Sequence, residues 1–350
     1  MRALLLALLS ALLFGASTPA SKLLLGSLEP FQLAGLLYLG AALAMLPVAA
    51  LQHRSGTRFR LDRANAARLA GAVLFGGVLG PVLLLVALRW TLAGSVSLLL
   101  NLEMVATAVL GVWLFREHLG RTGWAGVGCA VAAGAILAGG GGWPGVYAAL
   151  LVAAACLCWG VDNQLTASID GITPAQATLV KGAVAGAANL AIGLAVAPLH
   201  APSAVLATAL AVGALSYGAS IALYVASAQE LGATRAQAIF ASAPFVGAAL
   251  SFAWLGEPVG SAHALAAVLL IASVAALLSS RHGHAHVHEA VVHVHSHRHD
   301  DGHHLHAHPE LPPGIRHSHA HRHARLVHAH PHWPDLHHRH EHGSSQPPPS

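Results

Sequence analysis

Two apolar stretches decide the fold of this chain: Val105-Ala-Thr-Ala-Val-Leu-Gly-Val-Trp-Leu-Phe115 and Phe245-Val-Gly-Ala-Ala-Leu-Ser-Phe-Ala-Trp-Leu255. They begin 140 residues apart, and a glutamate follows each of them at the same spacing. Once a two-residue insertion is allowed, further residues of the two halves correspond: Gly80 with Gly218, Gly94 with Gly232, Met104 with Pro244 and Glu117 with Glu257. An internal repeat in an apolar chain is typical of duplicated membrane proteins, secondary transporters among them. The repeat therefore predicts a transport protein.

Composition divides the chain into two parts. The 350 residues are 55% hydrophobic and 9% charged, whereas about a quarter of the residues of a typical soluble domain are charged. Residues 281–350 hold 23 of the 27 histidines. A soluble fold could not cover so much continuous apolar sequence with polar surface. We therefore expect an integral membrane body followed by a polar tail.

Ten apolar stretches have the roughly 20 residues that a helix needs to cross the hydrocarbon. They are 3–25, 30–52, 66–88, 92–114, 122–140, 145–168, 174–196, 203–226, 232–254 and 259–280. Because five is an odd number, the second half would enter the membrane from the opposite side, which predicts inverted repeats. The expected fold is an all-α polytopic membrane protein, with five-helix repeats at 1–142 and 143–280 and a disordered tail at 281–350.

Basic residues predict the orientation. With the N-terminus inside, the outer side receives Lys22 and Arg89, and the cytoplasmic side receives Arg2, Arg54, Arg58, Arg60, Arg63, Arg68, Arg116, Arg121, Arg235 and Arg281. This bias follows the positive-inside rule. It predicts a multi-pass protein of the cytoplasmic (inner) membrane with both termini cytoplasmic, and no nucleic-acid partner. Gly76-xxx-Gly80 and Gly182-xxx-Gly186 would let helices approach closely, and such helices permit a homodimer without requiring one.

Both halves open on an aromatic residue followed by glycine, in Phe14-Gly15-Ala-Ser-Thr-Pro-Ala-Ser-Lys22 and Trp159-Gly160-Val-Asp-Asn-Gln164. With the ten short helices and the apolar runs that end at Glu117 and Glu257, this resembles the EamA-type transporters of the drug/metabolite transporter superfamily. The resemblance covers residues 1–280 and implies that small metabolites are moved, usually outward, by alternating access. That family usually has a proline in the fourth helix. Here Met104 replaces it, which predicts a straighter fourth helix.

Three ionisable residues lie well inside predicted spans: Glu103, Asp162 and Lys181. Such groups are costly in a bilayer and face the bundle interior or a water-filled cavity. Glu103 could carry a proton or bind a substrate cation, or it could form a fixed ion pair with Lys181. Lys181 could instead pair with Asp162 or receive a substrate carboxylate, and Asp162 could simply be hydrated near the cytoplasmic end of its helix.

Polar and aromatic neighbours extend the predicted substrate pocket. Trp159 precedes Asp162 by one helical turn and could add an apolar wall. Asn163 and Asn101 add uncharged polar groups. The predicted substrate-binding set is therefore Glu103, Asp162, Lys181, Trp159, Asn163 and Asn101. No nucleophile–base constellation or HExxH motif stands in residues 1–280, so we do not expect an enzyme.

The tail contains alternating histidines at His282, His284, His286, His288, His293, His295, His297, His299, His317, His319, His321 and His323. Imidazoles at this density predict weak binding of Zn²⁺, Ni²⁺, Co²⁺ or Cu²⁺, although transport itself would require no cofactor. Two alternatives to metabolite transport follow. The protein could export divalent metal collected by the tail, or it could be a membrane-anchored metal sensor or buffer.

Overall fold

The computed structural model describes residues 2–54, 62–115, 119–169 and 172–279, and four tail segments at 283–288, 292–297, 317–322 and 326–331. Within these residues, ten helical spans are long and apolar enough to cross a membrane. They confirm the expected all-α polytopic body. Boundaries differ from the predicted ones by a few residues; the third span, for example, runs over Arg63–Trp90 in place of 66–88.

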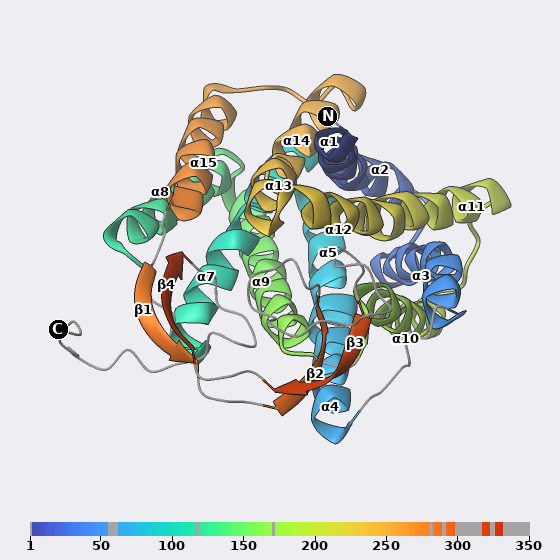
Figure 1. Ribbon diagram of the computed structural model, residues 1–350. Coiled ribbons are helices and arrows are strands. Elements are labelled where there is room, and N and C mark those ends of the chain that lie inside the picture. The colour runs from blue at the N-terminus through green and yellow to red at the C-terminus, as the bar shows by residue number, and fades with distance from the viewer. Residues whose placement is uncertain are drawn as a thin grey trace.

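Several spans consist of more than one helical element (Figure 1). Spans 1 to 5 are α1 (Arg2–Gly15) with α2 (Ser17–Leu24); α3 (Pro30–Arg54); α4 (Arg63–Ala72) with η1 (Val73–Leu79) and α5 (Gly80–Trp90); α6 (Ala93–Leu99) with α7 (Leu102–Phe115); and α8 (Arg121–Gly140). Spans 6 to 10 are α9 (Gly142–Ala167); α10 (Pro174–Val196); α11 (Ser203–Val212) with η2 (Gly213–Ala219) and α12 (Ser220–Leu231); α13 (Ala233–Phe240) with α14 (Ala243–Trp254); and α15 (Ser261–Ser279).

Span 4 is broken, so the expectation of a straighter fourth helix is wrong. α6 ends at Leu99, and α7 begins at Leu102. At the break, the Asn101 Nδ2 donates to the carbonyl of Leu98 at 2.9 Å. Side chains of this kind compete with the backbone ladder for hydrogen bonds, and a helix can therefore break without proline. Span 9 breaks at the corresponding place, before Pro244.

The third and eighth spans each contain a π-helical segment, η1 and η2, of seven residues. The two segments begin at Val73 and Gly213, within two residues of the register that aligns Gly80 with Gly218. A π-turn widens the helix and changes the pairing of its carbonyls, and such turns are frequent at functional sites. The duplication therefore extends to an irregular feature of the backbone.

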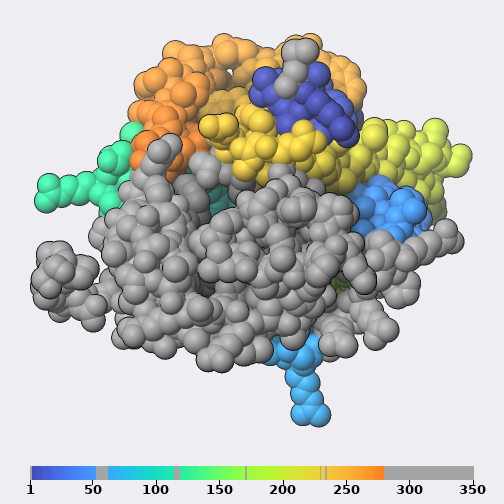
Figure 2. Space-filling view, in the orientation of Figure 1, coloured from blue at the N-terminus to red at the C-terminus, as the bar shows by residue number. Residues whose placement is uncertain are grey.

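Packing between the two halves follows the repeat as well. α3 packs beside α10, and α8 packs beside α15, on opposite sides of the bundle (Figure 1). α1 packs on α12 and α14, as Figure 2 shows for α1 and α12, while α9 packs in the corresponding way on α5 and α7. Exchanging the halves maps the α3–α10 and α8–α15 contacts onto themselves and the contacts of α1 onto those of α9, as expected of a duplicated chain. Helices of one half thus pack largely on helices of the other.

Glycines bring α3 and α10 close together. A Cβ atom at Gly182 would lie 2.8 Å from the Tyr38 carbonyl oxygen, and one at Gly186 would lie 2.8 Å from the Leu39 backbone nitrogen. Close backbone approach of this kind holds helices together where lipid supplies no hydrophobic drive for association. The Gly182-xxx-Gly186 prediction of tight helix packing is confirmed.

The tail contains four short strands in two antiparallel pairs. β1 (Gly283–His288) pairs with β4 (Leu326–Pro331), and β2 (Val292–His297) pairs with β3 (His317–Arg322). Alternating residues such as those of 284–288 have the period of a strand. The predicted disorder of the tail stays a prediction. His282, His299 and His323 lie outside the described residues. The other nine predicted metal ligands lie in β1, β2 and β3.

Candidate functional site

Asp162 of α9 and Lys181 of α10 form an ion pair inside the bundle. The Lys181 Nζ lies 2.8 Å from Oδ1 and 2.6 Å from Oδ2 of Asp162. The Thr166 Oγ1 also donates to Oδ1, at 3.0 Å. Asp162 is only 6% exposed, so these bonds replace the water that the carboxylate loses on burial. Of the partners considered for Lys181, the structure selects Asp162.

The π-turn η1 provides the floor of this site. Gly76 lies directly beneath Asp162, and a Cβ atom there would be 2.0 Å from Oδ2. The Gly76 carbonyl accepts hydrogen bonds from the Tyr38 hydroxyl at 2.5 Å and from the Trp159 Nε1 at 3.1 Å. The next carbonyl, that of Gly77, accepts from the Asn189 Nδ2 at 2.9 Å. Side chains of α3, α9 and α10 therefore hold η1 in place.

Glu103 lies in the first turn of α7, facing α9. Its Oε1 accepts from the Asn163 Nδ2 at 3.0 Å, and the same nitrogen lies 3.2 Å from the Thr107 Oγ1. Glu103 is half-buried and Asn163 is exposed. Among the described residues, no lysine or arginine lies within ion-pair distance of Glu103. The alternative in which Glu103 pairs with Lys181 is not the arrangement observed.

Five of the six predicted substrate-binding residues form two adjoining clusters. Asp162, Lys181 and Trp159 surround η1, while Glu103 and Asn163 join α7 to α9. The two clusters adjoin because Asp162 and Asn163 are consecutive on α9. Asn101 lies apart from both, since it is buried at the break in span 4 and bonds to its own backbone.

Sequence reasoning missed an aromatic cluster contributed by spans 1, 2, 8 and 9. The Tyr38 ring stacks on Tyr217 with centroids 5.9 Å apart, and Phe14 meets Tyr217 edge-on at 5.8 Å. Phe240 lies 5.2 Å from Phe14. Tyr38 links this cluster to the floor of the site through its bond to Gly76. The chain has only four tyrosines, and their rarity inside apolar spans was the signal that could have found them.

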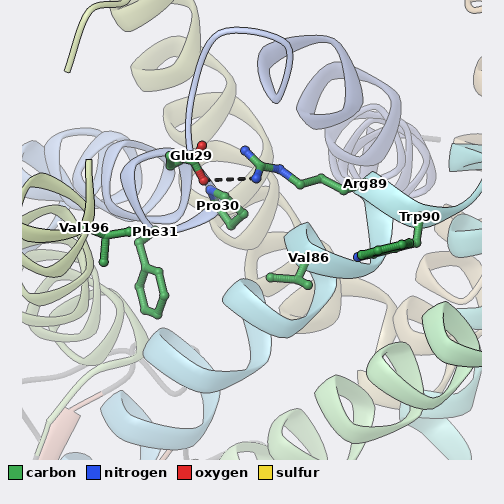
Figure 3. Close-up of a pocket in the computed structure, with 7 residues that line it drawn as sticks. All are labelled: Glu29, Pro30, Phe31, Val86, Arg89, Trp90 and Val196. Carbon is green, nitrogen blue, oxygen red and sulfur yellow. Dashed lines mark ion pairs between the residues drawn. The ribbon is translucent and has the colours of Figure 1, made fainter. Parts of the chain in front are cut away.

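A groove lies at the other end of the third span (Figure 3). It is lined by Glu29, Pro30, Phe31, Val86, Arg89, Trp90 and Val196. The Arg89 Nη1 pairs with the Glu29 Oε2 at 3.0 Å, and both side chains are more than a third exposed. None of the predicted substrate-binding residues lines this groove.

The described residues contain no ready-made metal centre. Within the residues that the structure describes, no group of three or more His, Cys, Asp or Glu side chains could hold a metal ion. The predicted binding of Zn²⁺, Ni²⁺, Co²⁺ or Cu²⁺ by the tail stays a prediction.

Comparison with known proteins is consistent with this architecture. Residues 1–139 and 146–279 match the family described as the EamA-like transporter family. The chain is 25% identical over 283 residues to an uncharacterized transporter of Methanothermobacter thermautotrophicus, which covers 76% of this chain and 82% of that relative. A solved structure, described as a crystal structure of protein, superposes with a TM-score of 0.57 at 17% identity, over 78% of this chain and 94% of that one. This last likeness concerns the fold alone.

Proposed function

Because the chain belongs to the EamA-like transporter family, we propose that it exports a small metabolite across the cytoplasmic membrane as a secondary transporter. The two inverted halves rock against each other and expose the site to each side in turn. Both termini lie in the cytoplasm, as the basic residues of the loops predict. The chain has no GxxxxGK[ST] loop in its sequence, and transport is coupled to an ion gradient or to exchange.

A single observation carries this proposal: three charged residues from spans 4, 6 and 7 lie in two adjoining clusters inside the bundle, and one of these clusters lies beside a π-turn. Glu103, which is half-buried and bonded to an amide, provides the carboxylate that meets a substrate cation or a coupling proton. Asp162 and Lys181 supply the remaining charges and stay paired when no substrate is bound. Trp159 forms the apolar wall. A carboxylate that must bind and release a charged partner needs an environment with access to water, and Asn163 is exposed beside it.

The test compares solute and metal levels in cells that express the intact chain or Glu103→Gln. We expect the intact chain to lower the cellular content of a small organic solute and Glu103→Gln to abolish that export. The amide keeps an oxygen that can accept from Asn163, so the variant should remain folded. Glu230→Gln is the matched control, since Glu230 is exposed at the end of α12, away from the site. Equal export by Glu103→Gln and the intact chain would remove Glu103 from the mechanism.

Cutting the chain after Ser280 separates the metabolite transporter from its alternatives. We expect the shortened chain to export the organic solute at the rate of the intact chain, because the predicted site lies wholly within residues 1–280. A change confined to Zn²⁺, Ni²⁺ or Co²⁺ content, and lost with the tail, would instead establish a metal exporter fed by the tail. Metal-dependent signalling without flux would establish a sensor. Metal analysis and metabolite profiling of the same cultures give both readouts.

A further inference from the structure

The loop between spans 9 and 10 caps the beginning of α6. The Glu257 Oε1 accepts from the Ala93 backbone N–H at 2.7 Å, and its Oε2 accepts from that of Gly94 at 2.8 Å. Gly256 has a φ of 66°, a conformation that glycine adopts without strain, and it turns the loop back onto α6. Both carboxylate oxygens are therefore bonded to the positive end of a helix in another span.

Lys22 makes the complementary contact at the same end of the bundle, which we call the outer end. Its Nζ donates to the carbonyl of Leu88 and, at 2.9 Å, to the carbonyl of Thr91, where α5 ends. Lys22 also interacts electrostatically with Glu257. A cation thus lies on the negative end of span 3 and an anion on the positive end of span 4. These two side chains tie together spans 1, 3, 4 and the loop between spans 9 and 10.

Packing at the outer end is correspondingly tight. A Cβ atom at Gly94 would lie 2.3 Å from the Phe252 ring of α14. The Ser95 hydroxyl lies 3.0 Å from the His263 Nε2 of α15. All seven residues of α6 are buried. α6 is therefore closely packed against α14 and α15.

The repeat supplies an internal comparison for this packing. In the register that aligns Phe14 with Trp159, Thr18 of span 1 corresponds to Asn163 of span 6. Thr18 is 3% exposed, whereas Asn163 is exposed. α6 likewise corresponds to α13, in which Arg235 and Ala238 are exposed. Corresponding positions in inverted repeats lie at opposite ends of the bundle, so the difference describes a molecule that is closed at the outer end and more open at the other.

We propose that Glu257 is the residue that holds the outer gate closed, by capping α6 beside Lys22, and that it leaves α6 when the site opens outward. The inference rests on alternating access in the proposed function, and it adds the position of one gate. Glu257 acts on the helices that close the path and not on the substrate. Its loss favours the outward-open arrangement, in which Thr18 becomes accessible and Asn163 becomes covered.

Cysteine accessibility measures the two ends separately. In a background with Cys129, Cys156 and Cys158 replaced, Thr18→Cys or Asn163→Cys is labelled with a membrane-impermeant maleimide in intact and in permeabilised cells. We expect Glu257→Ala to raise the labelling rate of Thr18→Cys about tenfold, equivalent to about 1.4 kcal/mol in the gate equilibrium. Labelling of Asn163→Cys should fall in permeabilised cells.

Two controls fix the interpretation. Glu29→Ala removes another carboxylate at the outer end, one bonded to Arg89 and not to α6, and it should leave both labelling rates unchanged. His200→Cys, exposed in the loop before span 8, should be labelled in intact cells in every variant and so reports the orientation. Glu257→Gln keeps the volume and one acceptor oxygen. It replaces Glu257→Ala if that variant elutes as an aggregate. The labelling rate of Thr18→Cys should then rise about threefold, because part of the cap remains.

If the labelling rate of Thr18→Cys is unchanged in a folded Glu257 variant, the proposal that Glu257 holds the outer gate closed is wrong, whatever the transport assay shows. A rise in that rate supports the gate even if no organic solute is found to be exported, and the proposed function would then fail by itself.

Discussion

Replacing Lys181 by methionine should lower the free energy of unfolding by about 3–5 kcal/mol, the usual cost of removing one partner of a buried ion pair. The change leaves the Asp162 carboxylate 6% exposed and bonded only to the Thr166 hydroxyl among the partners described above. Denaturant or thermal unfolding of purified protein, followed by tryptophan fluorescence, measures the loss. Solute export should disappear in the same variant.

The double variant Asp162→Asn/Lys181→Met separates stability from transport. With neither charge present, no uncompensated ion remains in the interior, and most of the lost stability should return. Export should stay absent, because the charges themselves are part of the proposed site. Arg89→Met is the matched control: it breaks the exposed pair with Glu29, which should cost at most about 1 kcal/mol. A Lys181→Met variant as stable as Arg89→Met would mean that Asp162 is not left as an uncompensated buried charge.

Gly76→Ala should be the most damaging single-methyl addition near the site. The added Cβ would lie 2.0 Å from the Asp162 Oδ2, far inside van der Waals contact, so α9 or η1 must move. Overpacking of a filled interior typically costs about 1–3 kcal/mol. The shift would also disturb the hydrogen bonds from Tyr38 and Trp159 to the Gly76 carbonyl. We expect both lower stability and loss of export.

Gly128→Ala provides the comparison for this variant. Gly128 lies within α8, and nothing comes within 4 Å of a Cβ built there. Alanine favours a helix over glycine by up to about 1 kcal/mol, so this variant should be as stable as the natural chain or slightly more stable, with full export. If Gly76→Ala behaves in the same way, η1 must be free to move away from α9, and the tight floor described here is not required.

The sequence was informative where the membrane imposes a rule on every residue. Because the hydrocarbon excludes charge, runs such as 122–140 and 174–196 had to be spans, and both lie where they were expected. The same rule identified Glu103, Asp162 and Lys181 as interior charges. It could not pair them, because partners on different helices depend on how those helices rotate against each other. In the structure, Lys181 pairs with Asp162, and Glu103 accepts a hydrogen bond from Asn163.

Local backbone irregularities were the other feature that the sequence did not reveal. The π-turns at Val73–Leu79 and Gly213–Ala219 have ordinary apolar sequences, and no residue in them requires a π-turn. The break in span 4 at Asn101 was missed because proline was taken as the signal for a broken helix. Side chains of other spans bond to the carbonyls of η1, whereas the break in span 4 carries the local bond from Asn101 to the Leu98 carbonyl.

Because helices of one half pack on helices of the other, the packing also sets the order in which contacts between spans can form during synthesis. Spans leave the ribosome in sequence, and most chains fold from the N-terminus as they emerge. Here the Gly76 carbonyl of span 3 accepts a hydrogen bond from the Trp159 indole of span 6, and the Gly77 carbonyl accepts one from the Asn189 amide of span 7. Both donors are synthesised after span 3. Until span 7 has been inserted, the early spans lack the groups that complete them. The hydrogen bonds that hold η1 can therefore be complete only after span 7 has been inserted.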